Sequence, residues 1–461
     1  MLSRATAEAV LAEALSTGGD FAEIFMEDTL SGNISMIDGN VDSALNSRDH
    51  GAGIRIYHGL NAVYVHTNDT TLEGLMSCAR KAAAAVGVER LSRQVQLTRS
   101  IPTNLHPIKL LPGDVSGQRK VRKLMDAYRT AKAYDNSISQ VITSLRDVDQ
   151  SVVIANSDGL FIEDRRVYTR MSVKAVASGG GENQTGSIGP GAMMGFELFD
   201  TRVDPAALGK EAARTAVTML RAPVCPAGTM PVAIDGGFGG VIFHEACGHS
   251  LEATSVARGN SEFSGRLGQK IASDCVTAID DGTMPNEWGS TNIDDEGTPT
   301  NRLVLIENGV LKNYMIDRLN SRRMNMPVTG SARRQSYAYA PTSRMRNTYI
   351  APGDSDPDEI ISTMGDGLYA AKMGGGSVNP ATGEFNFAVM EGYLVKDGKI
   401  DTPVRGATLV GKGSEIILKI DRVGRDMTMS QGMCGSASGS VPVNVGQPMI
   451  RVSSMTVGGG R

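Results

Sequence analysis

Residues 241–253 read VIFHEACGHSLEA, a pattern of the form H-E-x-x-x-H-x-x-E. Two of the six histidines of the chain, His244 and His249, lie in this stretch, and Glu245 follows the first of them. Neutral imidazoles are good ligands for a borderline metal such as zinc, and a carboxylate next to a metal-bound water is what hydrolysis requires. The stretch therefore predicts a metal-binding helix.

The five-residue spacing of the two histidines constrains that helix. A zinc-protease motif with four-residue spacing places both histidines on one helix face. At 3.6 residues per turn, a step of five separates the side chains by about 140°, which is poor for shared ligation. A single wide turn with i→i+5 hydrogen bonding would bring them together, and Gly248 would ease that distortion. Either the helix is therefore locally widened, or the two histidines do not form a metal site.

A domain boundary precedes this segment. The sequence RAPVCPAG at residues 221–228 has two prolines and a glycine directly after a predicted helix, which is typical of a break between domains. It divides the chain into an N-terminal α/β domain, residues 1–222, and a C-terminal β-rich domain, residues 223–461. Three prolines at residues 91–112 predict a connector that splits the first domain into two subdomains.

Turn signals and periodicity predict an α+β fold. In the C-terminal domain, Asn308-Gly309 and Asp397-Gly398 lie between apolar runs and predict β-hairpins. We expect an antiparallel, barrel-like domain that carries the metal-binding helix and is interrupted by a second helix at residues 356–371. In the N-terminal domain we expect helices at residues 72–86, 118–133 and 205–220, and strands at residues 22–26, 32–37, 52–57, 62–66, 152–155, 160–163 and 167–175.

Composition argues against several classes of partner. The formal net charge is −4 and no basic stripe occurs, so no nucleic-acid partner is expected. No run approaches the ~18 apolar residues that span a bilayer, so no membrane partner is expected either. Glu8 and Glu13 interrupt the apolar N-terminus, which therefore lacks the core of a signal peptide. Five scattered cysteines do not make a disulfide framework, and we expect a reducing compartment, the cytoplasm.

The chain resembles the TldD/PmbA family of cytoplasmic metalloproteases, on the metal-bearing TldD side. The resemblance covers nearly the whole chain and is more specific in the C-terminal half. Beyond residues 241–253, the matching segments are DEGT at 295–298, SARR at 331–334, RMRNT at 344–348, GGG at 374–376, GEFNF at 383–387, GMCG at 432–435, VPV at 441–443, QP at 447–448 and VGG at 457–459, with AEI at 22–24 and GAGIR at 51–55 in the N-terminal domain.

The resemblance implies a ligand set. In that family the two motif histidines and a cysteine near the C-terminus bind a metal, which here points to Cys434 as a thiolate ligand and to one zinc per chain. Cys/His ligation with one open position is an established catalytic zinc arrangement. Cys247 is a rival, because it follows His244 by three residues and lies near the same helix face. Spacing alone does not decide between the two cysteines.

Two glutamates have expected roles around the metal. Glu245 would act as the general base that takes a proton from metal-bound water and then protonates the leaving amine. Glu252 follows His249 by one turn and suits an outer partner that orients the imidazole. The alternative for both is an ordinary carboxylate on the surface of a helix.

Two glycines and two arginines are candidates for contacting substrate. Gly239 and Gly240 would let a peptide backbone approach closely, although a tight strand-to-helix turn explains them as well. Arg333 and Arg344 would hold a substrate carboxylate or polarise a carbonyl. The alternative for the arginines is surface charge or structural ion pairs.

The predicted function is metal-dependent hydrolysis of short or unfolded peptides, bound as an extended strand at a sheet edge. The resemblance implies a dimer that encloses the active sites, formed by two copies or with a metal-free paralogous subunit. The alternative is a non-catalytic binding or regulatory subunit of a protease or of a DNA gyrase-modulating complex. A pure binding subunit has no need of Glu245 beside the ligands, which favours the enzyme. A third hypothesis is an oxidoreductase that uses a metal bound by cysteine and histidine, but the chain lacks the sequence fingerprint of a dinucleotide-binding site.

Overall fold

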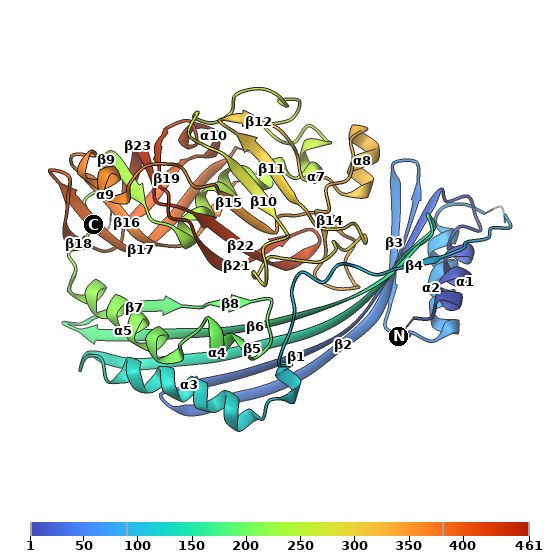
Figure 1. Ribbon diagram of the computed structural model, residues 1–461, viewed down its shortest axis with the longest axis horizontal. Coiled ribbons are helices and arrows are strands. Elements are labelled where there is room, and N and C mark those ends of the chain that lie inside the picture. The colour runs from blue at the N-terminus through green and yellow to red at the C-terminus, as the bar shows by residue number, and fades with distance from the viewer. Residues whose placement is uncertain (1, 89–90, 380–381, 460–461) are drawn as a thin grey trace.

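A long curved sheet forms the N-terminal half of the protein. The computed structural model describes residues 2–88, 91–379 and 382–459. The sheet has eight strands in the order β3-β2-β1-β5-β6-β4, with β7 and β8 also paired to β6 (Figure 1). Its strands are β1 (Phe21–Ile37), β2 (Asn40–His58), β3 (Asn61–Thr67), β4 (Thr98–Ser100), β5 (Ile138–Asn156), β6 (Leu160–Gly179), β7 (Glu182–Ile188) and β8 (Gly191–Ala192).

Helices cover opposite ends of this sheet, each over its own apolar core. At one end, α1 (Arg4–Ala14) and α2 (Leu72–Ala84) enclose a core that includes Ile54. At the other end, α3 (Gly117–Lys132) and α5 (Pro205–Arg221) enclose a core that includes Met171 (Figure 1). The remaining helical turns of this half are η1 (Pro112–Asp114) and α4 (Leu198–Thr201). The two helical layers share one sheet, because β1 pairs with both β2 and β5.

The C-terminal half contains a closed barrel and a second large sheet. One sheet has the order β16-β9-β23-β19-β17-β18, and an additional β16–β17 pairing closes five of its strands into a barrel. The other has the order β12-β11-β10-β15-β22-β21, so β12 and β21 are its edge strands. The strands are β9 (Gly228–Ile234), β10 (Ala278–Asp281), β11 (Arg302–Glu307), β12 (Val310–Leu311), β13 (Ala332–Arg333), β14 (Thr342–Ser343), β15 (Asn347–Ile350), β16 (Gly367–Val378), β17 (Glu384–Lys396), β18 (Lys399–Val404), β19 (Thr408–Lys412), β20 (Ile420–Val423), β21 (Thr428–Ser436), β22 (Gly439–Gln447) and β23 (Ile450–Gly458).

The predicted α+β class and the barrel are confirmed, but two details of the C-terminal half were wrong. The domain is mixed rather than antiparallel, because β9 runs parallel to β16 and β15 runs parallel to β22. The helix expected at residues 356–371 is only α9 (Pro357–Ser362). Gly365 has a φ of +71°, which ends the helical path and lets β16 begin at Gly367.

Strand lengths in the N-terminal half were also underestimated. The strands expected at residues 22–26 and 32–37 are parts of the single 17-residue strand β1, against a typical length of about 5–6 residues. In its middle, Glu27 is buried and Leu30 is exposed, so the alternation of buried apolar and exposed polar residues that marks a half-buried strand is lost there. The connector expected at residues 91–112 includes the short strand β4, which pairs with β6.

Buried ion pairs join the long sheet to the C-terminal half. Arg334 lies 2.6 Å from Glu23, and Arg55 lies 2.7 Å from both Glu23 and Glu296. Each of these side chains is at most 3% exposed. Separating the two halves would leave these buried charges without partners, which is strongly unfavourable. The network therefore fixes the segments of the C-terminal half that carry Glu296 and Arg334 to strands β1 and β2. No helix in the described part of the chain is long and apolar enough to cross a membrane.

Candidate metal centre

The helix at the centre of the motif is widened, as the spacing predicts. It begins as α6 (Val241–Phe243), continues as the π-helical turn η3 (His244–Gly248) and ends as the 3-10 turn η4 (His249–Leu251). The N–H of His249 donates to the carbonyl of His244, an i→i+5 hydrogen bond. Gly248 has an ordinary helical φ of −55°. A Cβ at Gly248 would lie 2.3 Å from Sδ of Met345, so packing rather than backbone freedom explains this glycine.

The wide turn brings both histidines to Cys434. The Nε2 atoms of His244 and His249 each lie 3.3 Å from Sγ of Cys434. Ligand atoms of the three residues all lie within 4.8 Å of one another. Cys434 is buried on β21, far from the motif in sequence. Cys247, the rival ligand, is instead buried in the apolar core, where burial raises the pKa of its thiol.

The electrostatics of this cluster suit a cation. Burial alone would raise the pKa of the Cys434 thiol, but the imidazoles of His244 and His249 outweigh it and lower that pKa to about 3. Burial alone would lower the pKa of His249, but Glu252 and Cys434 hold it well above its usual range. A thiolate between two imidazoles is a donor set that zinc prefers. The residues present therefore fit the predicted metal.

Glu252 and Arg344 support two of the three candidate ligands. Oε2 of Glu252 lies 3.2 Å from Nδ1 of His249, which leaves Nε2 directed toward Cys434. Arg344 donates from Nη2 to the carbonyl of Cys434 and from Nη1 to Oγ of Ser438, and its Nε lies 3.8 Å from Oε1 of Glu252. Because Arg344 is 0% exposed, its guanidinium does not face substrate, contrary to the prediction for this residue.

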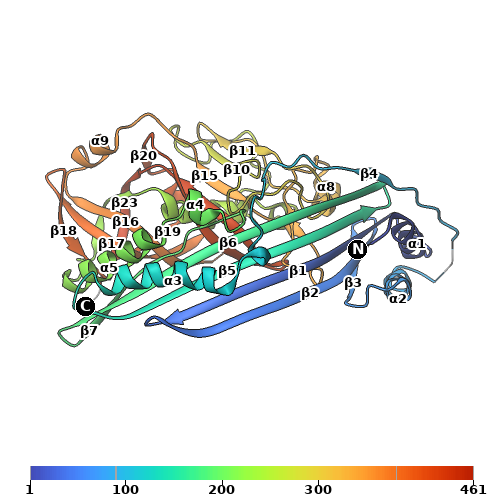
Figure 2. The same cartoon turned by 60° about the horizontal axis from the view of Figure 1, so that its bottom comes forward.

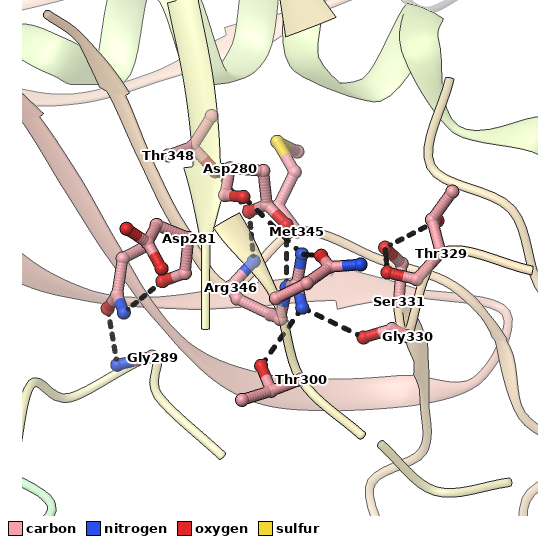
Figure 3. Close-up of polar contacts among 12 residues, drawn as sticks. Asp280, Asp281, Gly289, Thr300, Thr329, Gly330, Ser331, Met345, Arg346 and Thr348 are labelled. Atoms are coloured by element: carbon pink, nitrogen blue, oxygen red, sulfur yellow. Dashed lines mark hydrogen bonds and ion pairs between the residues drawn. The ribbon is translucent and has the colours of Figure 1, made fainter. Parts of the chain in front are cut away.

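Arg346 anchors the segment that carries Arg344 and Met345. Its Nε donates to the carboxylate of Asp280 at 2.7 Å, and its Nη1 donates to the carbonyl of Gly330 at 3.0 Å. Figure 3 shows these bonds converging on a single guanidinium from several segments. The backbone beside the candidate metal centre is therefore held by a buried ion pair rather than by regular secondary structure.

Glu245 lies on the open side of the cluster. Its Oε2 is 3.7 Å from Nε2 of His249, and its side chain is 28% exposed. His249 is 19% exposed, whereas His244 and Cys434 are nearly inaccessible. Glu245 thus lies next to the candidate ligands, on the side from which solvent and substrate would arrive.

The two glycines before the helix pack against β22. A Cβ at Gly240 would lie 2.5 Å from the backbone nitrogen of Gly446, and one at Gly239 would lie 2.7 Å from Nε2 of Gln447. Both glycines are buried. The close approach of turn η2 (Gly237–Gly240) to β22 therefore explains them, and the predicted contact with a peptide backbone is not supported.

Arg333 borders a cleft between the long sheet and the β21–β22 hairpin. The cleft has a volume of about 760 Å³ and is also lined by Met433, the neighbour of Cys434. Nη1 of Arg333 donates to the carbonyls of Met345 and Pro442. Arg333 is only 4% exposed, but unlike Arg344 it lines the cleft, so the accessible part of its side chain could contact a ligand there.

Two residues that hold β21 in place were not identified from the sequence. Nε1 of Trp288 donates to the carbonyl of Gly432 at 2.9 Å, and Nη2 of Arg170 donates to the carbonyl of Gln431 at 3.2 Å. Arg170 also lies over the Trp288 ring. The signal available was that Trp288 is the one tryptophan of the chain, because a buried indole N–H requires an acceptor.

Known proteins match this chain along its length. Three models of the PmbA/TldA metallopeptidase family match it: domain 1 at residues 22–86, the central domain at residues 110–220 and the C-terminal domain at residues 227–459. A protein of Haemophilus influenzae named metalloprotease TldD homolog is 35% identical and is matched over 95% of this chain and 93% of its own length. A zinc metalloprotease TldD homolog of Saccharolobus solfataricus is 34% identical over 57% of this chain and 58% of its own length.

A solved structure shares the fold. It is a protein of Thermotoga maritima described as a candidate modulator of a DNA gyrase, with a TM-score of 0.79, 21% sequence identity, and coverage of 95% of this chain and 96% of that one. At that identity the likeness concerns the fold alone. Because all three family domains match in order and a relative of 35% identity matches over nearly the full length, the chain belongs to the TldD/PmbA metallopeptidase family.

Proposed function

We propose that this protein is a metallopeptidase that hydrolyses short or unfolded peptides. The observation that carries the proposal is the convergence of His244, His249 and Cys434 beside a partly exposed carboxylate, Glu245. A binding site alone requires the ligands but gives no reason for the carboxylate. The names of relatives such as the Haemophilus influenzae protein agree with this class of reaction.

His244, His249 and Cys434 would hold the metal, which we propose is zinc, one per chain. When bound, it would supply a Lewis acid that polarises the scissile carbonyl and favours ionisation of water. Glu252 would keep His249 in the tautomer that carries its proton on Nδ1, so that the lone pair of Nε2 is free to bind the metal. A thiolate among the ligands places more negative charge at the centre than three imidazoles do.

Glu245 would carry the proton. Its carboxylate accepts a proton from the attacking water as the new C–O bond forms. The same carboxyl group then donates that proton to the leaving nitrogen as the C–N bond breaks, which restores the carboxylate and balances the hydrolysis. Its position next to His249 on the exposed side of the cluster supports this role.

An extended strand is the substrate conformation that this architecture favours. Main-chain hydrogen bonds at a sheet edge give affinity without demanding particular side chains. On the edge strand β21, the carbonyls of Gln431 and Gly432 already accept bonds from Arg170 and Trp288. The carbonyl of Cys434 likewise accepts from Arg344. We therefore propose that a substrate strand adds at the exposed residues at the end of β21, Met433, Gly435 and Ser436, and that Arg333 in the neighbouring cleft binds a substrate oxygen.

We further propose a cytoplasmic dimer. The five cysteines are all free thiols, which fits a reducing compartment. The partner would be a second copy or a metal-free paralogue, and enclosure by it would exclude folded proteins from the centre. A regulatory subunit is the second candidate, since the structural neighbour from Thermotoga maritima is described as a candidate gyrase modulator.

The experiment compares an unstructured peptide with a folded protein as substrates. The purified chain is stripped with a chelator, reloaded with one equivalent of zinc, and its products are identified by mass spectrometry. We expect cleavage of the peptide only after reloading, and no cleavage of the folded protein. A zinc-loaded chain that cleaves neither, alone or mixed with a paralogous subunit, would favour the regulatory function.

A further inference from the structure

We propose that the cleft beside β21 contains a carboxylate subsite, formed by the guanidinium groups of Arg146, Arg170 and Arg333. It would bind one carboxylate of a peptide substrate, either the C-terminal group or an Asp or Glu side chain. The proposal rests on the proposed function, because it assumes that a peptide strand lies along β21. It adds a preference to that function: peptides that bring a negative charge to this subsite bind more tightly than neutral ones.

The three arginines come from both walls of the cleft. Arg146 on β5 and Arg170 on β6 lie directly opposite each other in the antiparallel pairing of these strands, which run side by side along the long sheet (Figure 2). Arg333 lies on β13, in the C-terminal half. All three line the cleft of about 760 Å³. The two halves of the protein therefore both contribute positive charge to this cleft.

Arg333 is a buried cation without an anionic partner among the described residues. It is 4% exposed, and its Nη1 donates to the carbonyls of Met345 and Pro442. Its Nε and Nη2 have no acceptor in the described part of the chain, and neither is sealed from solvent. Buried charges are ordinarily paired, and here burial lowers the pKa of Arg333. Donors of this guanidinium are thus available to an anion in the cleft.

Arg170 is held in place by uncharged groups. Its Nε and Nη2 donate to the carbonyls of Gly189 and Gln431, and its guanidinium carbon lies 5.5 Å from the centroid of the Trp288 ring. Its Nη1 has no acceptor among the residues that the structure describes. These contacts orient the guanidinium but leave its charge uncompensated. An anion would therefore meet a donor whose orientation is already fixed, which lowers the entropic cost of binding.

Arg146 adds a second uncompensated charge opposite Arg170. Like charges directly opposite each other destabilise a sheet, and burial together with the charge of Arg146 lowers the pKa of Arg170. Arg146 is exposed and makes no hydrogen bond or ion pair with any described residue. No contact within the described chain therefore explains this arginine, whereas a carboxylate between the two guanidinium groups would offset their repulsion.

The carboxylates that line the cleft do not neutralise this cluster. Asp295 is paired with Arg166, whose Nη1 lies 2.6 Å from its Oδ1. Glu27 pairs on β5 with the residue six positions after Arg146, which is about 20 Å further along the sheet. Asp49 lies on β2, which β1 separates from β5. The arginine end of the cleft therefore lacks an internal counter-ion among the described residues.

The subsite lies beside the strand on which a substrate would add. Arg170 binds the carbonyl of Gln431, three residues before Cys434 on β21, a separation of about 10 Å. Met433, next to Cys434, lines the same cleft. A peptide whose scissile bond lies at the candidate metal centre would therefore bring a residue a few positions away to the arginines. Guanidinium groups bind carboxylates through paired N–H donors, so an acidic group is favoured at that position.

Binding can be measured by tryptophan fluorescence and by isothermal titration calorimetry. Trp288 is the one tryptophan of the chain and contacts Arg170, so an anion that binds Arg170 should change its emission. Zinc-loaded Glu245→Gln is used, so that peptide is not consumed during the titration. One unstructured peptide with an acetylated N-terminus is compared in three forms: amidated without acidic residues, amidated with one Asp at each position in turn, and with a free C-terminal carboxylate.

We expect at least one form with a carboxylate to bind about tenfold more tightly than the neutral form, the gain from one charge-assisted contact. Arg146→Glu in the same background should remove this difference, because its own carboxylate would neutralise Arg170. Since Arg146 makes no contact with the described residues, this variant should keep the wild-type Tm. Lys174→Glu is the matched control: it makes the same change of charge at an exposed position on β6, about 13 Å from Arg170 and outside the cleft, and should keep the preference.

Either source of the carboxylate supports the proposal, and the form that binds most tightly identifies it. Equal affinities for all forms, or no binding of any form, would overturn the proposal. So would a preference that survives Arg146→Glu or that disappears equally in Lys174→Glu. Cleavage by the wild type together with equal affinities would refute the subsite alone, whereas binding that depends on Arg146 without cleavage by the wild type would refute the proposed function alone.

Discussion

Sγ of Cys434 lies 3.3 Å from Nε2 of His249, although 185 residues separate them in sequence. His249 follows a π-helical turn, whereas Cys434 lies on the edge strand β21. Their approach depends on the packing of turn η2 and the motif helix against the β21–β22 hairpin. The candidate metal centre therefore exists only when both segments of the C-terminal half are folded together.

Replacing Cys434 should abolish metal binding. We expect Cys434→Ser to lose most of its zinc, because the serine hydroxyl does not ionise at neutral pH and is a poor ligand for this metal. Metal content is measured by mass spectrometry of the dialysed protein. Cys247→Ser is the matched control, since Cys247 is buried outside the cluster, and it should retain zinc. Unchanged zinc in Cys434→Ser would refute the ligand assignment.

Replacing Glu245 should separate catalysis from metal binding. Glu245→Gln keeps the size of the side chain but cannot accept a proton, so we expect peptide cleavage to fall by about 10²–10⁴-fold. Zinc content should match that of the wild type, because Glu245 is not among the three candidate ligands. Full activity in this variant would rule out the role of general base.

The local chemistry of the motif was predictable from the sequence, whereas its long-range partners were not. The five-residue spacing of His244 and His249 required a wide turn on geometric grounds alone, and the structure contains it. No such constraint links either histidine to Cys434, so the choice of Cys434 over Cys247 depended on family resemblance. Only the packing of β21 against the motif helix determines which cysteine lies nearby.

Residue type alone also misled the interpretation of buried charge and of glycines. Arg344 was expected to contact substrate, yet its guanidinium donates hydrogen bonds to the carbonyl of Cys434 and to Oγ of Ser438. Gly240 was expected to admit a peptide, yet Gly446 occupies that space. In each case the partner lies on a segment distant in sequence, and local patterns do not reveal it.

Replacing Glu252 should weaken metal binding without removing a ligand. Its carboxylate lies 3.2 Å from Nδ1 of His249, and losing such a partner typically reduces metal affinity about 10–100-fold. We expect Glu252→Gln to show a loss in this range in a competition titration with a chromophoric chelator. Glu262→Gln, a change of the same chemistry at an exposed site, should leave zinc affinity unchanged. Equal affinities in the two variants would contradict the role given to Glu252.

Removing the metal should lower the thermal stability of the chain. A ligand that binds only the folded state adds about 2.7 kcal/mol when present at one hundred times its dissociation constant. We therefore expect dialysis against a chelator to lower Tm by several degrees, and zinc to restore it. Cys434→Ser, which should not bind zinc, should show no response to chelator or metal. A wild-type Tm that changes with neither chelator nor zinc would contradict the binding of a metal between the motif helix and β21.

Glu296 should make stability depend on pH through a site remote from the metal centre. Burial raises the pKa of Glu296 from 4.5 to about 7, although Arg55 opposes the shift. The folded protein then binds this proton more tightly than the unfolded chain does, so stability falls as pH rises from about 4.5 to about 7. Glu296→Gln removes this titration. The difference between the Tm of the variant and that of the wild type should therefore shift in favour of the variant as pH rises from about 4.5 to about 7. Asp28→Asn should leave the same slope intact, because the hydrogen bonds from Arg48 lower the pKa of Asp28 and the group stays ionised throughout. Parallel Tm curves for the wild type and Glu296→Gln would show that Glu296 does not titrate in the folded protein between pH 4.5 and 7.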